Sequence, residues 1–231
     1  MGFTFKQFHI DDDRCGMKVS TDSVLLGSWA RVVPEGRTLD LGCGSGLLAL
    51  CCAQRGSGRI DALELDPDAA SQARDNVAAS PWHQQIQVFQ GDLRQWADAH
   101  QGRYRHLISN PPYFEDSLAA PCPKRAQARS GLSLNRLLEA MAQLLAPWGH
   151  ISLVLPAFSL QRLNQAAMES GLTLTRLTRV SSTPVKGDKL ILAELARETA
   201  DCPIQQLVIH GPDGGYSKEF RALTADFYLK G

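Results

Sequence analysis

One short stretch of the chain, Asn110-Pro111-Pro112-Tyr113, combines residue types that suit the recognition of a planar amine. The side-chain oxygen of Asn110 and the carbonyl of Pro111 are hydrogen-bond acceptors, and the prolines have no N–H group that would compete for them. The ring of Tyr113 can stack on a flat group, and Phe114 follows it directly. An ordinary proline turn with a core tyrosine has the same sequence, so this stretch alone does not decide between the two.

A glycine-rich turn about seventy residues upstream provides a second candidate site. It joins a short predicted strand, 37–42, to a predicted helix, 47–55, and glycines there let a ligand approach the backbone at the helix N-terminus. Glu64 follows Gly42 by 22 residues, the offset at which an acid at the next strand end accepts hydrogen bonds from ribose hydroxyls. The candidate ligand-binding residues are Asp40, Gly42, Gly44, Gly46, Glu64 and Asp92.

The acids among these residues help to choose between two ligands. A nicotinamide dinucleotide carries phosphates, and its binding turn has the spacing Gly-x-Gly-x-x-Gly, whereas this chain has Gly-x-Gly-x-Gly. Asp40 lies two residues before the first glycine, where a carboxylate would repel a diphosphate, and Asp92 adds another carboxylate. S-adenosylmethionine has hydroxyls, an amine and a sulfonium but no phosphates, and it fits these residues better. A tight glycine turn without any ligand is the remaining alternative.

Alternating strands and helices are predicted to position these residues. The alternation predicts an α/β fold with a doubly wound, mostly parallel, seven-stranded Rossmann-like sheet and one antiparallel strand, and ligands bind over the carboxyl ends of such strands. The strands are expected at 37–42, 59–65, 85–90, 104–109, 149–155, 172–180 and 190–195, with 207–209 extending the edge and 3–10 forming an edge strand or hairpin arm. The helices are expected after Ser20 and at 47–55, 68–79 (begun by Asp66-Pro67), 134–145, 158–170 and 218–228.

The chain is expected to form one domain, 1–231, with an N-terminal arm and helix (1–35), a core (36–200) and a C-terminal edge strand and helix (201–231). Of its 231 residues 44% are hydrophobic and 21% charged, and no apolar stretch approaches the about 20 residues of a membrane helix. No signal peptide is evident, and the six cysteines lack zinc or redox spacing, so reduced thiols, no metal and a cytoplasmic location are expected.

The charge distribution along the chain is uneven. The net charge is zero, which argues against general binding of polyanions. However, residues 121–190 contain nine basic and three acidic residues, directly after the Asn-Pro-Pro-Tyr stretch. This excess favours a local contact with a phosphate backbone, and solvated helix faces are the alternative.

The motifs together resemble those of a known class of enzymes. Asp40 to Gly46, Glu64, Asp92 and Asn110-Pro111-Pro112-Tyr113 resemble the first four motifs of the class I methyltransferases that modify amino groups. Segments 3–8, 17–22, 80–82 and 211–228 resemble the tRNA1(Val) (adenine-37) N6-methyltransferase family of gamma-proteobacteria, nearly from end to end. Cys43 stands within the glycine turn where alanine would be as natural, and it is small enough to leave the site intact.

The resemblance implies methylation of the N6 amine of the adenine just 3′ of the anticodon, with S-adenosylmethionine as cofactor and a tRNA anticodon loop as partner. A monomer without metal or membrane association is expected. Asn110, Pro111 and Tyr113 are then the catalytic residues. Lys18, Thr21 and Asn110 join the cofactor site, and the expected RNA contacts are Phe114, Lys124, Arg125 and Arg129.

Other functions remain open. The same turn would hold a protein glutamine amide or the amine of another RNA base, and a non-enzymatic module that binds adenosylmethionine or RNA would share the sequence features. Glutamine-modifying methyltransferases resemble this chain in the core but usually carry an N-terminal helical domain, for which the residues before the first motif leave no room. Retention of every chemical position speaks against a non-enzymatic module.

Overall fold

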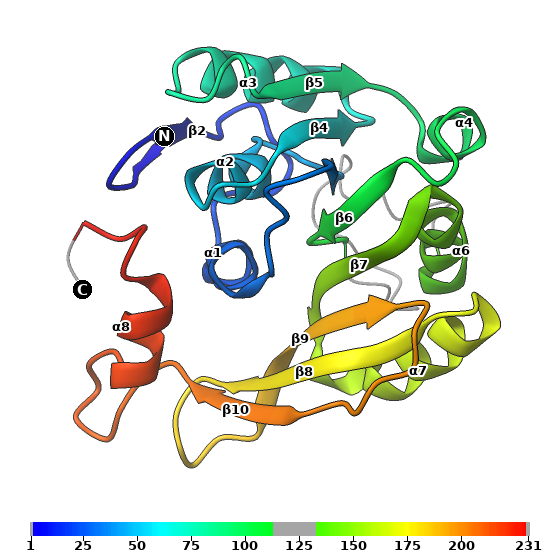
Figure 1. Ribbon diagram of the computed structural model, residues 1–231. Coiled ribbons are helices and arrows are strands. Elements are labelled where there is room, and N and C mark those ends of the chain that lie inside the picture. Colours follow the sequence, from blue (N-terminus) through cyan, green and yellow to red (C-terminus); the bar gives the residue numbers. More distant parts are fainter. Residues whose placement is uncertain (1, 113–132, 230–231) are drawn as a thin grey trace.

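A mostly parallel β-sheet forms the centre of the molecule in the computed structural model, which describes residues 2–112 and 133–229 (Figure 1). Within these ranges the sheet contains the seven predicted strands, and β9 alone runs antiparallel to its neighbours, as expected. β10 pairs in parallel with β8 and extends the edge as an eighth strand. In spatial order the strands are β10 (Ile204–Val208), β8 (Thr173–Ser181), β9 (Asp188–Ala196), β7 (Leu145–Pro156), β6 (Tyr104–Ser109), β3 (Arg37–Leu41), β4 (Arg59–Glu64) and β5 (Ile86–Gln90).

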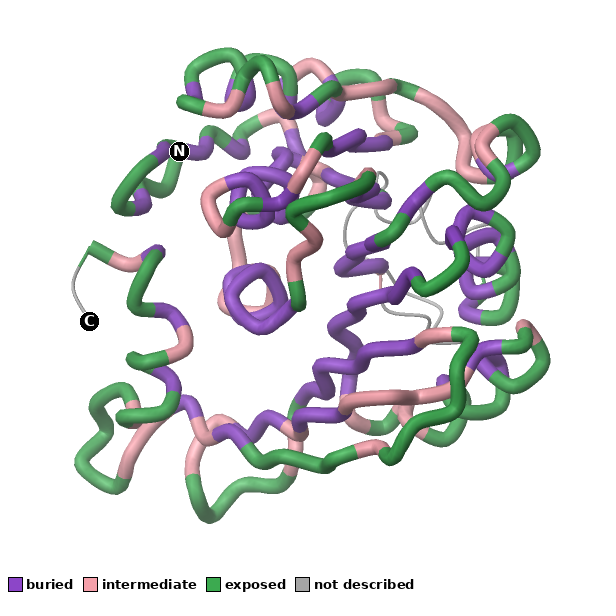
Figure 2. Tube along the Cα trace, viewed as in Figure 1, coloured by how far each residue is buried: buried purple, intermediate pink, exposed green. Residues whose placement is uncertain are grey.

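Helices cover both faces of the sheet, which is therefore doubly wound (Figure 1). One group of buried apolar side chains joins α1, α2, α3 and α8 to the sheet, and a second group joins α4, α6 and α7 to it. Buried residues follow the central strands in Figure 2. None of the helices in the described ranges is long and apolar enough to cross a bilayer. Their bounds are α1 (Thr21–Trp29), α2 (Leu47–Gln54), α3 (Pro67–Ala78), α4 (Leu93–Ala99), α6 (Leu134–Leu144), the 3₁₀ turn η1 (Ala157–Ser159), α7 (Leu160–Glu169) and α8 (Lys218–Thr224).

Several helices begin at local capping signals. The side chain of Ser20 accepts a hydrogen bond from the N–H of Ser23, and Asp66 caps α3 in the same way, so both predicted helix starts are confirmed. α4 was not predicted from the sequence, because its seven residues are too few to show a clear apolar period. Its N-cap residue is Asp92. α8 ends at Thr224, earlier than predicted.

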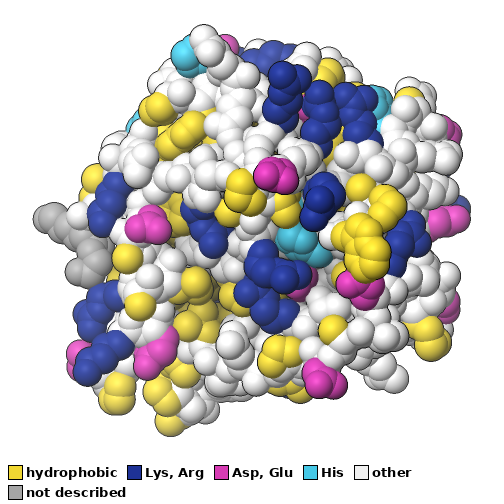
Figure 3. Space-filling view, in the orientation of Figure 1, with side chains coloured by type: hydrophobic (Ala, Val, Ile, Leu, Met, Phe, Trp, Pro, Cys, Tyr) yellow, Lys and Arg dark blue, Asp and Glu magenta, His cyan; other side chains and the backbone are white. Residues whose placement is uncertain are grey.

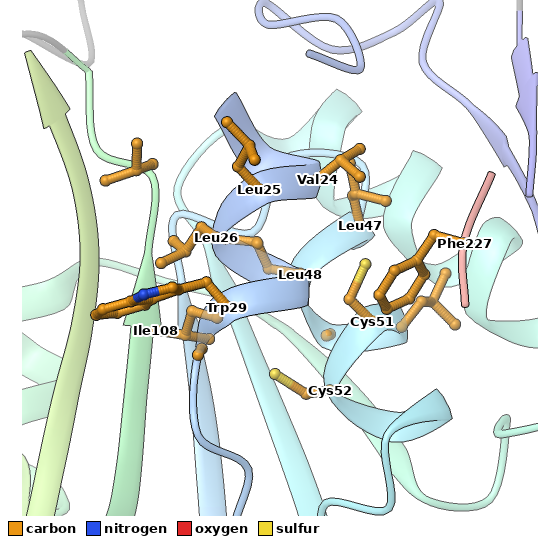
Figure 4. Close-up of a cluster of buried hydrophobic side chains, with 14 of the residues drawn as sticks. Val24, Leu25, Leu26, Trp29, Leu47, Leu48, Cys51, Cys52, Ile108 and Phe227 are labelled. Atoms are coloured by element: carbon orange, nitrogen blue, oxygen red, sulfur yellow. The ribbon is translucent and has the colours of Figure 1, made fainter. Parts of the chain in front are cut away.

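α1 packs on α2 at very short range, and this contact fixes its position over the sheet (Figure 4). A Cβ atom on Gly27 would lie 2.8 Å from the Cβ atom of Cys51, so the two helices leave no space for a side chain there. Trp29 at the end of α1 donates from its indole N–H to Thr178 Oγ1 at 2.9 Å. The guanidinium carbon of Arg176 lies 3.6 Å from the centre of the Trp29 ring.

The N-terminal and C-terminal segments are hydrogen-bonded to each other. β1 (Gly2–Thr4) and β2 (His9–Asp11) form a hairpin apart from the main sheet, so of the two alternatives expected for 3–10, an edge strand or a hairpin arm, the structure shows the second. Between them, the N–H of Lys6 donates to the carbonyl of Phe227 at 2.9 Å, and the Lys6 amine donates to the carbonyl of Ala225 at 2.6 Å. The described N-terminal and C-terminal segments consequently lie on the same side of the molecule (Figure 1).

Candidate active site

Three predicted site residues meet at the carboxyl edge of the sheet, where the neighbouring strands β6, β3 and β4 end. Asp40 lies near the end of β3, in register with Ile108 of β6 and Ala62 of β4. Glu64 is the last residue of β4, and Asn110 directly follows β6. Because ligands of parallel sheets bind outside the carboxyl ends of the strands, this is the expected place for a site.

The glycine turn after β3 leaves open space beside its backbone. Gly42, Gly44 and Gly46 have positive φ angles of 67°, 53° and 82°, which residues with side chains rarely adopt. A Cβ atom on Gly42 or Gly44 would meet no atom within 4 Å. The N–H groups of Gly42 and Cys43 both donate to the carbonyl of Leu63, at 2.9 and 3.1 Å. A ligand can therefore approach a bare backbone that is firmly held.

The carboxylate of Glu64 is bound by backbone N–H groups. Its Oε2 accepts from Gly44 at 2.8 Å, and its Oε1 accepts from Leu65 at 2.9 Å and from Asp66 at 3.0 Å. A carboxylate offers about four acceptor positions, so these bonds leave about one for a ligand hydroxyl. Glu64 thus ties the glycine turn to the end of β4, a role that its sequence offset does not reveal.

Asp40 is completely buried and lacks one hydrogen-bond partner. Its Oδ2 accepts from the N–H of Ala49 at 2.9 Å, whereas its Oδ1 has no partner among the described residues. Burial raises the pKa of the Asp40 carboxyl to about 7, although the bond from Ala49 opposes the rise, and the negative charge of Glu64 adds to it. The unpartnered oxygen is enclosed by protein, and through Ala49 the Asp40 carboxyl group supports the first turn of α2, directly after the glycine turn.

The N-terminal segment 11–19 lies beside the glycine turn, and Asn76 of α3 connects the two. Asn76 Nδ2 donates to the carbonyls of Asp11 at 2.8 Å and Ser45 at 2.9 Å, and its Oδ1 accepts from the N–H of Asp11 at 3.0 Å. Lys18, a predicted cofactor residue in this segment, donates to the carbonyl of Asp12 at 2.6 Å. The sequence gives no signal for Asn76, because both of its partners are distant in the chain.

Asn110 contacts the first turn of α1. Its Nδ2 donates to Ser23 Oγ at 2.8 Å, and its Oδ1 has no hydrogen-bond partner within residues 2–112 and 133–229. Thr21, another predicted cofactor residue, lies in the same helical turn, close to the hydroxyl of Tyr228 in the C-terminal segment. Burial raises the pKa of Tyr228 to about 12. The start of α1 therefore connects the Asn-Pro-Pro turn with the end of the chain.

The remaining predicted residues are only partly described. Asp92 follows β5, and its side chain accepts from the N–H of Arg94 at 2.8 Å. Pro111 is buried beside Asn110. Within the described ranges no three His, Cys, Asp or Glu side chains are grouped so as to hold a metal. Five predicted residues lie outside the described residues: Tyr113, Phe114, Lys124, Arg125 and Arg129.

The fold and site together define a class I methyltransferase. The family model for the methyltransferase small domain matches residues 18–169. A predicted O-methyltransferase from Agrobacterium tumefaciens superposes with a TM-score of 0.69 at 21% identity, over 89% of this chain and 96% of that one. A putative RNA methyltransferase from Pyrococcus horikoshii gives a TM-score of 0.57 at 16% identity, over 85% and 93% of the two chains. At such identities these structures show the shared fold.

Three relatives are much more similar in sequence, and each is named tRNA1(Val) (adenine(37)-N6)-methyltransferase. The protein of Tolumonas auensis is 45% identical, over 99% of this chain and 97% of its own. The protein of Citrobacter koseri is 44% identical, over 99% and 95%. The protein of Shewanella loihica is 43% identical, over the full length of both chains. The chain belongs to the family of these proteins, and the resemblance found in its motifs is confirmed.

Proposed function

We propose that this protein transfers a methyl group from S-adenosylmethionine to the N6 amine of an adenine in tRNA, namely adenine 37 beside the anticodon of tRNA1(Val). The observation that carries the proposal is the similarity, along the whole chain, to proteins with that name. The position of Asn110 at the carboxyl edge of the sheet supports it. Methylation of a glutamine amide or of another RNA base amine is the alternative, because the same turn suits any flat amine.

The residues around the glycine turn fit S-adenosylmethionine. The open backbone at Gly42 and Gly44 admits a ligand, and the acidic side chains of Asp40 and Glu64 behind the turn disfavour a phosphate. The remaining acceptor position of Glu64 suits a ribose hydroxyl. When bound, the cofactor supplies an electrophilic methyl group on a sulfonium sulfur. The proposed binding residues are Lys18, Thr21, Asp40, Gly42, Gly44, Gly46, Glu64, Asp92 and Asn110.

Asn110 and Pro111 are proposed to hold the reacting amine. The lone pair of an aromatic amine is delocalised into its ring, so the amine is a weak nucleophile. Asn110 Oδ1 and the carbonyl of Pro111 accept its two N–H bonds, fix its direction and stabilise the positive charge that develops on nitrogen. Positioning of this kind is worth roughly 7–11 kcal/mol in favourable cases. Tyr113 is proposed to stack on the base.

RNA binding is proposed to depend on a few local contacts. The net charge of the chain is zero. On the face shown in Figure 3, several Lys and Arg side chains gather at the upper edge, and the others are scattered, with Asp and Glu side chains between them. An anticodon loop offers unpaired bases that can be turned outward at low cost. The contacts are assigned to the residues that follow the catalytic turn in sequence: Phe114, Lys124, Arg125 and Arg129.

Labelled S-adenosylmethionine and bulk tRNA provide the test. After incubation with the protein and digestion of the RNA, the label is expected in N6-methyladenosine. Asn110→Ala is expected to abolish transfer and leave cofactor affinity within a few-fold, because its acceptor is needed mainly by the reacting amine. Label in another nucleoside, or in a protein glutamine, would overturn the proposed substrate. A near-parental single-turnover rate in the variant would overturn the role of Asn110.

A further inference from the structure

The side chain of Asn110 can serve an amine in only one of its two amide orientations. The oxygen and the NH₂ group are similar in size, and a half-turn about the Cβ–Cγ bond exchanges them. With Oδ1 toward the substrate, the side chain accepts a hydrogen bond from the amine. With Nδ2 toward the substrate, the NH₂ group of Asn110 and the substrate amine face each other, and both are hydrogen-bond donors. The proposed reaction therefore requires a contact that fixes the orientation.

Ser23 provides a contact at the nitrogen end of the amide. Asn110 Nδ2 donates to Ser23 Oγ at 2.8 Å, an ordinary hydrogen-bond length. Ser23 Oγ also lies 3.4 Å from the hydroxyl oxygen of Ser20, the N-cap residue of α1, a long contact in which either oxygen can be the donor. A hydroxyl has a single proton, and when that proton points to Ser20 the lone pairs of Ser23 face Asn110. The bond from Asn110 Nδ2 to Ser23, with Ser20 as an available acceptor for the Ser23 proton, thus favours the orientation that leaves Oδ1 for a substrate.

Both sides of this contact belong to well-packed parts of the fold. Asn110 is only 9% exposed and is followed by two prolines. The preceding residue, Ser109, donates from Oγ to the carbonyl of Leu41 at 2.7 Å, which ties the end of β6 to β3. On the other side, the residues of α1 that follow Ser23 are buried through to its end. Neither partner can move away without disturbing the core, so the contact can hold a side chain in one orientation.

We infer that Ser23 is a positioning residue, whose hydroxyl, supported by Ser20, orients the Asn110 amide so that the site selects a substrate N–H group. The inference rests on the proposed function for its substrate, an aromatic amine of RNA. Ser23 acts through Asn110 rather than on the substrate itself. A substrate that presents an oxygen acceptor instead meets the Asn110 oxygen and is rejected, so Ser23 contributes to the choice of amines.

Three variants and two readouts test this inference. Ser23→Ala removes the hydroxyl, and Ser23→Thr retains one. Ser28→Ala is the matched control on the same helix, because the buried Ser28 hydroxyl has no partner among the described residues. The first readout is the NMR signal of the Asn110 NH₂ group in isotope-labelled protein, identified by its absence from the spectrum of Asn110→Asp. The second is single-turnover methyl transfer to tRNA, with cofactor affinity measured by calorimetry.

Ser23→Ala is expected to shift the hydrogen-bonded NH₂ proton and to slow transfer about tenfold, as for the loss of one ordinary hydrogen bond, with cofactor affinity within about twofold of the parent. Ser23→Thr and Ser28→Ala are expected to retain both signal and rate. An unchanged NH₂ signal or an unchanged rate in Ser23→Ala would overturn the inference. A loss of cofactor affinity as large as the loss of rate would overturn it too. If the parent transfers no methyl group to tRNA, the proposed function fails, whereas the NH₂ signal still decides the hydrogen bond.

Discussion

The substitution Asp40→Asn examines a fully buried carboxyl group that has one unpartnered oxygen. Burial raises the pKa of this group from 3.8 to about 7. The folded protein therefore keeps a proton that the unfolded chain releases above about pH 4, so the folded state loses stability as the pH rises from there through about 7. At about 1.4 kcal/mol per pKa unit the whole effect is about 4 kcal/mol, of which about 3 kcal/mol falls above pH 5.

Asparagine has nearly the same shape and can still accept the hydrogen bond from Ala49, but it does not ionise. Relative to the parent, Asp40→Asn is expected to gain about 3 kcal/mol of unfolding free energy between about pH 5 and about pH 8. Urea unfolding at a series of pH values measures this difference. If the new amide group itself changes the unfolding free energy, it does so by the same amount at every pH. The test is therefore the change with pH of the difference in unfolding free energy between variant and parent.

Two histidines affect the pH profile of the parent in the opposite sense. Burial lowers the pKa of His106 and of His150, so both destabilise the folded state as the pH falls below about 6.5. They are present in both proteins, and their effect cancels in the difference between parent and variant. A difference in unfolding free energy that stayed constant from about pH 5 to about pH 8 would refute the reasoning about Asp40.

Three further changes test the cofactor site, the α1–α2 contact and the RNA contacts. Glu64→Ala is expected to weaken S-adenosylmethionine binding more than about tenfold in calorimetry, since a ribose hydroxyl and three backbone N–H groups lose their acceptor. An unchanged affinity would place the ribose elsewhere. Gly27→Ala is expected to lower the unfolding free energy by about 1–3 kcal/mol, because its Cβ would lie 2.8 Å from that of Cys51, whereas Gly187→Ala, in open space, is the neutral control. Equal stability of these two glycine variants would contradict the packing argument. Replacing Lys124, Arg125 and Arg129 together by alanine is expected to reduce the slope of log tRNA affinity against log salt concentration by about two units, with cofactor affinity unchanged. A slope equal to that of the parent would exclude these three residues as RNA contacts.

The sequence predicts those parts of the fold that depend on neighbouring residues. The helix expected at 47–55 is observed at Leu47–Gln54, and the helix expected at 68–79 at Pro67–Ala78, because glycine turns and N-caps determine helix starts locally. β7 begins at Leu145, earlier than the expected 149–155. The stretch that precedes residue 149 contains a proline and Trp148, which has a positive φ of 61°, and the register against β6 shifts there. These residues are typical of a turn and therefore hide the beginning of the strand.

The contacts that fix the site residues escape sequence reasoning because each joins distant segments. Ser23 and Asn110 are 87 positions apart, and Asn76 and Asp11 are 65 apart. A residue type also does not tell whether its polar atoms are free for a ligand. Glu64 lies at the end of β4, where the sequence predicts it, yet most of its acceptor positions bind backbone N–H groups of the turn and of the residues that follow β4. The acid is therefore held in place before a ligand arrives, and binding loses little side-chain entropy at this position, which favours affinity.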